Sequence, residues 1–177
     1  MPFDTALHKA SHNGDFKQVT ALIEAGEIDV NTPGASERRP LHRAAGGNHV
    51  KICEYLLSNG AGVDLADRSG RTPLHWASIG GGTSSASLLI ENGANVLAET
   101  GSKATPLHFS VEKGNIDMVP LLANNAGNKK LELFRAQRDD GKTALNIAKE
   151  GKNKGIIKAL KEAGDPSATS SAICIIS

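Results

Sequence analysis

The most regular feature of the hydrophobic pattern is a leucine that is followed by a polar histidine and recurs along most of the chain. This pair occurs at Leu7-His8, Leu41-His42, Leu74-His75 and Leu107-His108, with spacings of 34, 33 and 33 residues. A fifth copy, Leu145-Asn146, follows 38 residues after the fourth. Self-similarity at a period of this length predicts a stack of small structural units.

Each unit is predicted to contain two short helices. In the third unit, Thr72-Pro73 begins the first helix, because Thr can cap a helix and Pro is tolerated in the first turn. Leu88, Leu89 and Ile90 mark the second helix of this unit. In the second unit, the corresponding helix has a buried face, as the spacing of Val50, Cys53, Leu56 and Leu57 indicates. Glycines stand where the helices must end, at Gly14, Gly81 and Gly114 after first helices and at Gly26, Gly60, Gly93 and Gly164 after second helices.

The repeat divides the chain into five units and a tail. We place the units at about 1–34, 35–67, 68–100, 101–138 and 139–164, and the tail at 165–177. The longer interval before the fifth unit places an insertion of five residues within Asn124 to Leu133. A unit of this kind buries its apolar face only against its neighbours, so the lysine-rich last unit is expected to act as a polar cap.

The segments Thr72-Pro73-Leu74-His75-Trp76-Ala77 and Thr105-Pro106-Leu107-His108 resemble the opening motif of the ankyrin repeat. The resemblance implies an all-α solenoid of helix-turn-helix units, with finger loops that project beside a concave helical face. In this family the motif histidine hydrogen-bonds to neighbouring turns, which implies a structural role for His8, His42, His75 and His108. The chain departs from the motif at Arg39, at 81–85 and at Asn146, and we expect these changes to affect local stability and not the fold.

Composition and charge limit the classes of function. The 20 basic and 19 acidic residues nearly cancel, which argues against nucleic-acid binding, where a basic excess displaces counterions. Cys53 and Cys174 are the only cysteines, so neither a disulfide framework nor a Cys-based zinc cluster is expected, and a reducing compartment is favoured. No run of about 18 apolar residues occurs, and we expect a cytoplasmic protein.

No signature of catalysis, of a metal site or of a cofactor stands out. Residues 80–84 lack the Lys-Ser or Lys-Thr pair and the preceding strand of a phosphate loop. The motif histidines fall in successive layers, too far apart to share one ion. Cys53 is assigned to the core, and His12 and His49 to the surface. We therefore expect a monomeric, non-enzymatic protein without metal or cofactor.

Partner contacts in ankyrin stacks usually come from the finger loops and from the ends of the first helices. Ser36, Gly46 and Asp139 occupy such positions, and our main candidates are Arg38, Arg68, Ser69, Arg71, Trp76, Ile79, Ser102, Glu112, Lys113 and Lys142. The arginines favour an acidic segment of a partner protein, because Arg is enriched at interfaces and pairs with carboxylates. The alternative is a set of solvated charges. Trp76 is interpreted either as a partly buried helix contact or as an exposed anchor.

The last residues carry a second signal. Residues 165–172 are small and polar and predict a flexible tether, and Cys174-Ile175-Ile176-Ser177 fits the C-a-a-X prenylation motif, in which a final Ser favours farnesyl. From Asn128 to Glu162 there are ten Lys or Arg against five Asp or Glu. A basic unit beside a lipidated tail would be attracted to an anionic leaflet, whereas the alternative is a soluble cap.

Two functions follow from these features. The first is an adaptor at the cytosolic face of a membrane, which holds another protein on its concave face and carries a farnesyl group on Cys174. The second is a soluble cytosolic or nuclear ankyrin regulator or assembly chaperone without lipidation.

Overall fold

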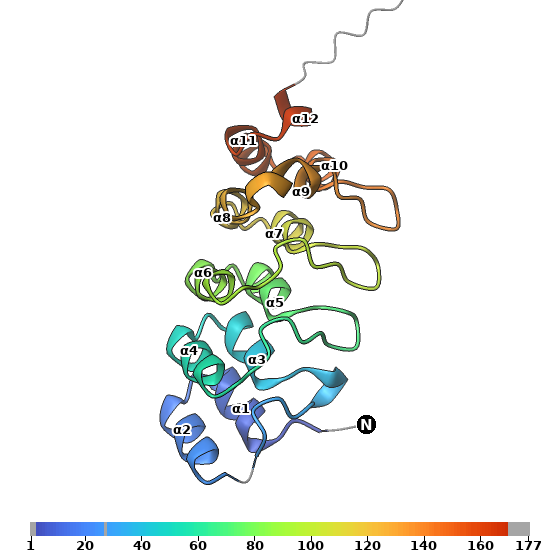
Figure 1. The fold of residues 1–177 in the computed structure, drawn as a ribbon. Coiled ribbons are helices and arrows are strands. Elements are labelled where there is room, and N and C mark those ends of the chain that lie inside the picture. The colour runs from blue at the N-terminus through green and yellow to red at the C-terminus, as the bar shows by residue number, and fades with distance from the viewer. Residues whose placement is uncertain (1–2, 27, 170–177) are drawn as a thin grey trace, which may run out of the picture.

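The computed structural model describes residues 3–26 and 28–169, and it is a one-dimensional stack of helix pairs (Figure 1). The described residues contain helices and no β-strand, which confirms the predicted all-α solenoid. The five pairs are α1 (Ala6–Asn13) with α2 (Phe16–Glu24), α3 (Pro40–Gly46) with α4 (Val50–Ser58), α5 (Pro73–Gly80) with α6 (Thr83–Glu91), α7 (Pro106–Lys113) with α8 (Met118–Asn125), and α10 (Ala144–Glu150) with α11 (Lys154–Glu162).

The stack has two layers of helices. The first helices α1, α3, α5, α7 and α10 contact one another in order, and α2, α4, α6, α8 and α11 do the same. Four finger loops, at residues 34–39, 67–71, 100–104 and 138–142, project to one side from the ends of the first-helix layer (Figure 1). The first of them contains the short 3-10 helix η1 (Ala35–Glu37). The fingers and the first helices together bound one long face of the molecule.

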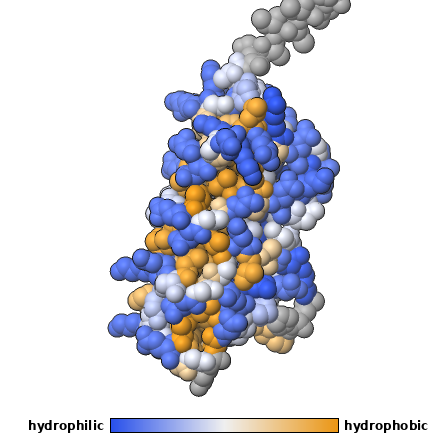
Figure 2. Space-filling view, in the orientation of Figure 1, coloured by the Kyte–Doolittle hydropathy of each residue, from blue (hydrophilic) through white to orange (hydrophobic). Residues whose placement is uncertain are grey.

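The repeated leucines form the spine of the core. Leu7, Leu41, Leu74 and Leu107 are each at most 1% exposed. A fully buried leucine contributes about 2 kcal/mol relative to an exposed one. Cys53 is buried among them, as its position in the apolar pattern predicted. Elsewhere on the surface, apolar side chains form a broken band along the stack, bordered by hydrophilic ones (Figure 2).

Glycine sets the turn inside three of the units. Gly14, Gly81 and Gly114 follow α1, α5 and α7 with φ of 76°, 74° and 77°. This left-handed conformation is unfavourable for a residue that has a Cβ atom, and glycine adopts it readily. The second unit differs, because Asn48 takes the left-handed conformation there with φ 56°. Its side-chain Oδ1 accepts a hydrogen bond of 3.0 Å from Ser85 N, at the start of α6. Asn48 therefore supports the second helix of the third unit, where 81–85 departs from the motif.

The inserted residues before the fifth unit form additional helical structure. The 3-10 helix η2 (Gly127–Lys129) and the helix α9 (Lys130–Arg135) follow α8 directly. Leu133 and Phe134 of α9 are 0% and 3% exposed, so this helical segment is anchored to the core by two apolar side chains. Its outer surface carries exposed Lys129 and Arg135.

The prediction of a flexible tether that begins at Asp165 is wrong for residues 165–169. Asp165 is fully buried, and its Oδ1 accepts a 2.8 Å hydrogen bond from Ser167 N. Pro166–Thr169 form the short helix α12, and Ala168 packs against the core. An Asp before a Pro is a favourable helix start, because the carboxylate caps free N–H groups and Pro needs none. Cys174, the predicted lipidation site, lies outside the described residues.

His49 is not an ordinary surface residue, contrary to our prediction. It is half-buried, and its Nε2 lies 2.9 Å from the carbonyl oxygen of His12 in the preceding unit. The same turn that reverses the chain between α3 and α4 therefore also ties the second unit to the first. His12 itself is exposed, as predicted. Across the described ranges, no helix is both long and apolar enough to span a membrane.

Candidate protein-binding surface

The motif histidines connect each unit to the next finger loop. In the third unit, Thr72 N donates to His75 Nδ1 at 3.1 Å, and His75 Nε2 lies 3.0 Å from the carbonyl oxygen of Ala104. Since Nδ1 accepts from a backbone N–H, the ring proton is on Nε2, which donates to the carbonyl. His8, His42 and His108 make the same link to the carbonyl oxygens of Arg38, Arg71 and Lys142, at 2.9, 3.0 and 3.2 Å.

Burial keeps these imidazoles neutral. It lowers the pKa of His42 and of His75 from the ordinary value of 6.5 to about 4, and it lowers the pKa of His8 and His108 as well. The histidines lie in successive layers, and the described part of the chain holds no group of three or more His, Cys, Asp or Glu that could bind a metal ion. Burial also raises the pKa of the Cys53 thiol to about 11, which leaves it protonated and a poor nucleophile.

The finger loops are joined to one another through their backbones. Arg68 N donates to Ser36 O at 2.9 Å, Gly101 N donates to Ser69 O at 3.0 Å, and Asp139 N donates to Ser102 O at 3.0 Å. The carbonyl oxygens of Ser69 and Ser102 are thus already engaged within the stack, and their side chains remain exposed. The row of fingers is a linked structure that presents side chains at the regular interval of the repeat.

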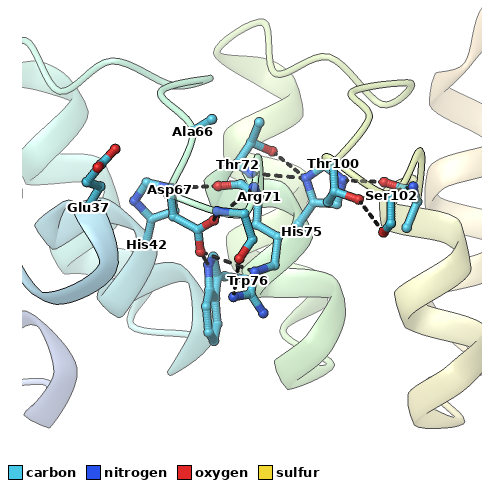
Figure 3. A network of polar contacts seen from close by, with 12 residues as sticks. Glu37, His42, Ala66, Asp67, Arg71, Thr72, His75, Trp76, Thr100 and Ser102 are labelled. Atoms are coloured by element: carbon cyan, nitrogen blue, oxygen red, sulfur yellow. Dashed lines mark hydrogen bonds and ion pairs between the residues drawn. The ribbon is translucent and has the colours of Figure 1, made fainter.

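A buried carboxylate organises the second finger (Figure 3). Asp67 Oδ1 accepts hydrogen bonds from Ser69 N at 2.8 Å and from Arg71 N at 3.0 Å. Its Oδ2 accepts from Arg71 Nε at 3.2 Å and from Trp76 Nε1 at 3.1 Å. The Asp67 side chain is 0% exposed, so four donors compensate for the loss of its hydration. Asp67 therefore fixes the indole of Trp76 relative to the finger.

Two guanidinium groups lie over the indole ring of Trp76. The guanidinium carbon of Arg38 is 5.0 Å from the ring centre, and that of Arg71 is 4.7 Å from it, within the range of a cation–π contact. The indole remains half-buried. It is the partly buried residue that one interpretation predicted.

Comparison with known proteins places this architecture in a family. A family model described as ankyrin repeats in three copies matches residues 7–100 and 95–170. The chain belongs to the ankyrin-repeat family. Three relatives share shorter stretches with it. The chain is 38% identical over 61 residues to alpha-latrocrustotoxin-Lt1a of Latrodectus tredecimguttatus, a match that covers 34% of this chain and 4% of the toxin.

The other two relatives are similar in extent. The chain is 38% identical over 60 residues to Palmitoyltransferase AKR1 of Eremothecium gossypii, which covers 33% of this chain and 8% of that protein. It is 34% identical over 64 residues to Ankyrin repeat domain-containing protein 39 of Homo sapiens, which covers 36% of this chain and 34% of that protein. The chain thus spans about a third or less of the length of these relatives, and the likeness concerns the ankyrin repeats.

Within the ankyrin stack, the ten candidate contact residues are all half-buried or exposed, and three clefts bring most of them together. Arg38, Trp76 and Ile79 line a cleft of about 140 Å³, which we call the Trp76 cleft. Ser69, Arg71 and Ser102 line a second cleft between neighbouring fingers. Glu112 and Lys113 line a third beside α10. Arg68 and Lys142 do not line any of the three.

Most of the candidate charges already have partners inside the molecule. Arg68 pairs with Glu37 at 3.4 Å, Arg71 with Asp67 at 3.2 Å, Glu112 with Arg138 at 3.4 Å, and Lys142 with Glu150 at 2.7 Å. Arg38 makes no ion pair with a carboxylate of the described residues. Burial lowers the pKa of Arg38, with Arg43 as the next cause. The three predicted arginines are therefore not equivalent, and Arg38 is the one whose guanidinium is available to pair with a carboxylate of a partner protein.

Our selection of candidates missed several residues that line the same clefts. They are His12 and Arg43 in the Trp76 cleft, Phe109 in the second cleft and Ile147 in the third. Three of them share a signal with Trp76, since Arg43, Phe109 and Ile147 also directly follow the motif position. Selecting the residue after the motif position in every unit would have identified these three residues.

Proposed function

We propose that this ankyrin stack is a protein-binding adaptor that holds an acidic segment of its partner along the finger loops and first helices. Ankyrin repeats generally mediate contacts between proteins, and their interface is a row of side chains on a rigid stack. The observation that carries the proposal is the half-buried Trp76, whose ring has both Arg38 and Arg71 over it within 5.0 Å of its centre. Fixed aromatic and arginine side chains are those that most often dominate protein interfaces, because little entropy is lost on binding.

A photo-crosslinking experiment tests which face binds. A benzophenone amino acid is placed at Ser102, which is exposed on the third finger, and in a matched protein at Ser58, which is exposed at the end of α4 in the other layer. After irradiation in the native cell, the Ser102 probe is expected to give crosslinked proteins that the Ser58 probe does not give. Trp76→Ala should weaken those crosslinks. Identical products from both positions, or products from Ser58 alone, would contradict binding at the finger side.

We also propose, for the case in which Ser177 is the carboxyl-terminal residue of the protein, that Cys174 is farnesylated and brings the adaptor to a membrane. The support from the described residues is the basic last unit. Lys154, Lys158 and Lys161 follow one another at the spacing of one helix face and are exposed on α11. Lys158 pairs with Glu162 at 3.6 Å, whereas Lys149, Lys152, Lys154 and Lys161 make no ion pair with a described carboxylate.

An intact-mass measurement tests the modification. Protein from its native cell is compared with Cys174→Ser, and the expected result is the farnesyl increment with loss of the last three residues in the wild type alone. Membrane fractionation of the same two proteins should show the wild type in the membrane fraction and Cys174→Ser in the supernatant. An unmodified wild-type mass would remove the lipid anchor and leave the alternative, an ankyrin regulator or chaperone that is not lipidated.

A further inference from the structure

The Trp76 cleft owes its existence to one missing side chain. Gly46 stands at the end of α3, at the position that His12, Ile79, Glu112 and Glu150 occupy in the other four units. A Cβ atom at Gly46 would meet Trp76 Cε3 at 3.7 Å, which is ordinary van der Waals contact. Any side chain there would therefore grow into the space in front of the indole. Glycine leaves that space open between His12 and Ile79.

The two sides of this cleft differ in chemistry. Trp76 and Ile79 supply an apolar wall, and Arg38 and Arg43 supply positive charge next to it. Arg43 is paired with Asp4, and Arg71, the other guanidinium over the indole, is paired with the buried Asp67. Arg38 is the guanidinium of this group that makes no ion pair with a described carboxylate, and its planar group already faces the ring. An occupant must therefore combine apolar volume with one negative charge.

We infer that the Trp76 cleft receives a bulky aliphatic side chain of the partner protein, with an adjacent Asp or Glu of the same segment pairing with Arg38. This inference rests on the proposed adaptor function and specifies the chemistry of the segment that is held. A cleft of about 140 Å³ has room for a side chain of leucine size and not for a folded element. The aliphatic group covers the indole and excludes water, which strengthens the ion pair at Arg38.

Short peptides capped at both ends test the chemistry directly. The probe is acetyl-Gly-Glu-Leu-Glu-Gly-amide, and its controls replace both Glu by Gln or replace Leu by Ala. Trp76 is the only tryptophan of the chain, so its fluorescence reports binding without a label. We expect saturable binding of the Glu-Leu-Glu peptide and about tenfold weaker binding of each control, because a charge-assisted contact and a buried aliphatic group each contribute about that factor.

Two variants locate the binding site. Gly46→Ile places at this position the side chain that Ile79 has in the next unit, and it should abolish binding of the peptide. Arg38→Gln should remove the preference for Glu over Gln while leaving the weak binding of the Gln-Leu-Gln peptide. Arg135→Gln is the matched control, since Arg135 is exposed on α9 and makes no ion pair with a described carboxylate. Circular dichroism verifies that each variant has the fold of the wild type.

The outcomes separate this inference from the proposed function. Equal binding of the Glu and Gln peptides, absence of binding, or a Glu preference that survives in Arg38→Gln would overturn the inference. So would tighter binding of acetyl-Gly-Gly-Leu with a free carboxyl end, because the negative charge would then come from a chain terminus. The crosslinks at Ser102 do not depend on this cleft being filled, so they can succeed while the peptides fail.

Discussion

The indole nitrogen of Trp76 donates a 3.1 Å hydrogen bond to Asp67, a carboxylate with no exposed area. The two residues belong to different structural elements, since Asp67 begins the second finger and Trp76 lies in α5. The bond therefore couples the position of the finger to the helix that follows it. Because Arg38 and Arg71 both lie over the same indole, the geometry of the Trp76 cleft depends on Asp67.

Replacing Asp67 by Asn should lower the free energy of unfolding by about 2–4 kcal/mol, because an amide group cannot accept from all four donors and loses the ion pair with Arg71. The unpaired Trp76 should also become more solvated, which shifts its fluorescence to longer wavelength. Urea unfolding followed by circular dichroism measures the first effect and the emission spectrum measures the second. Asp139→Asn, an exposed aspartate on the fourth finger, is the control and should leave both unchanged. A stability of Asp67→Asn within 0.5 kcal/mol of the wild type would contradict the role of Asp67.

Two glycines in the contact between α3 and α5 should respond oppositely to the same substitution. A Cβ atom at Gly80 would lie 2.2 Å from the carbonyl oxygen of Gly46, a severe clash with backbone, whereas the nearest atom to a Cβ atom at Gly46 is Trp76 Cε3 at 3.7 Å. We expect Gly80→Ala to destabilise the stack by about 2 kcal/mol or more, because the two helices must separate. Gly46→Ala should be neutral or stabilise by up to about 1 kcal/mol, since Ala is the better helix former. Thermal unfolding of the two variants measures the difference. Equal midpoint temperatures would contradict the close contact between Gly80 and the carbonyl oxygen of Gly46.

Much of the fold could be predicted from the sequence because each unit repeats the same local rules. These rules determine structure within a few residues: Pro begins a helix, Gly forms a left-handed turn, and Leu at a fixed position enters the core. Because the units repeat, the same rules predict the structure of most of the chain. The features that were missed depend on contacts between units. Asp4 is an example, since its Oδ1 accepts a 2.8 Å hydrogen bond from Ala35 N and its carboxylate pairs with Arg43. Nothing in the local pattern around Asp4 indicates either partner.

The candidate surface was predictable in position and less so in chemistry. The family resemblance indicated the finger loops, and all ten selected residues have exposed area. The three arginines looked equivalent in the sequence, because an ion pair such as Arg68 with Glu37, 31 residues apart, forms only when two fingers stack. The distinction of Arg38 and the opening at Gly46 are likewise properties of neighbouring units in contact.

The third finger contains a residue in an unfavourable conformation, and relieving it should stabilise the protein. Lys103 has φ 57°, at the position where Gly70 and Gly141 stand in the neighbouring fingers with φ 80° and 75°. Lys103→Gly should raise the free energy of unfolding by about 0.5–1 kcal/mol, because the left-handed conformation costs a residue with a Cβ atom more than glycine loses in entropy. Lys113→Gly, at the end of α7, is the contrasting control and should destabilise by about 1 kcal/mol. A loss of stability in Lys103→Gly, measured by urea unfolding, would argue against strain at this position.

The buried histidines should make the stack sensitive to acid. The pKa of His42 and of His75 is about 4 in the folded protein and 6.5 ordinarily, so between these values the unfolded chain binds more protons than the folded one. The contribution of these histidines to the free energy of unfolding is therefore fully present above pH 6.5 and is lost as the pH falls below that value. We expect a loss of about 2 kcal/mol from each of the two histidines between pH 7 and pH 5, measured by urea unfolding at both pH values.

A variant identifies the groups responsible for this pH dependence. Asn146 already stands at the motif position of the fifth unit, where its Oδ1 accepts from Thr143 N at 3.0 Å and, among the described residues, makes no onward link to a finger loop. His75→Asn should likewise keep the local cap at Thr72 and lose the 3.0 Å link to Ala104, which lowers stability at pH 7 by about 1–3 kcal/mol. Between pH 7 and pH 5, however, this variant should lose about 2 kcal/mol less than the wild type, since one depressed pKa is gone. The exposed His12→Asn should behave as the wild type at both pH values, and an unchanged pH dependence in His75→Asn would assign the acid sensitivity to the carboxylates instead.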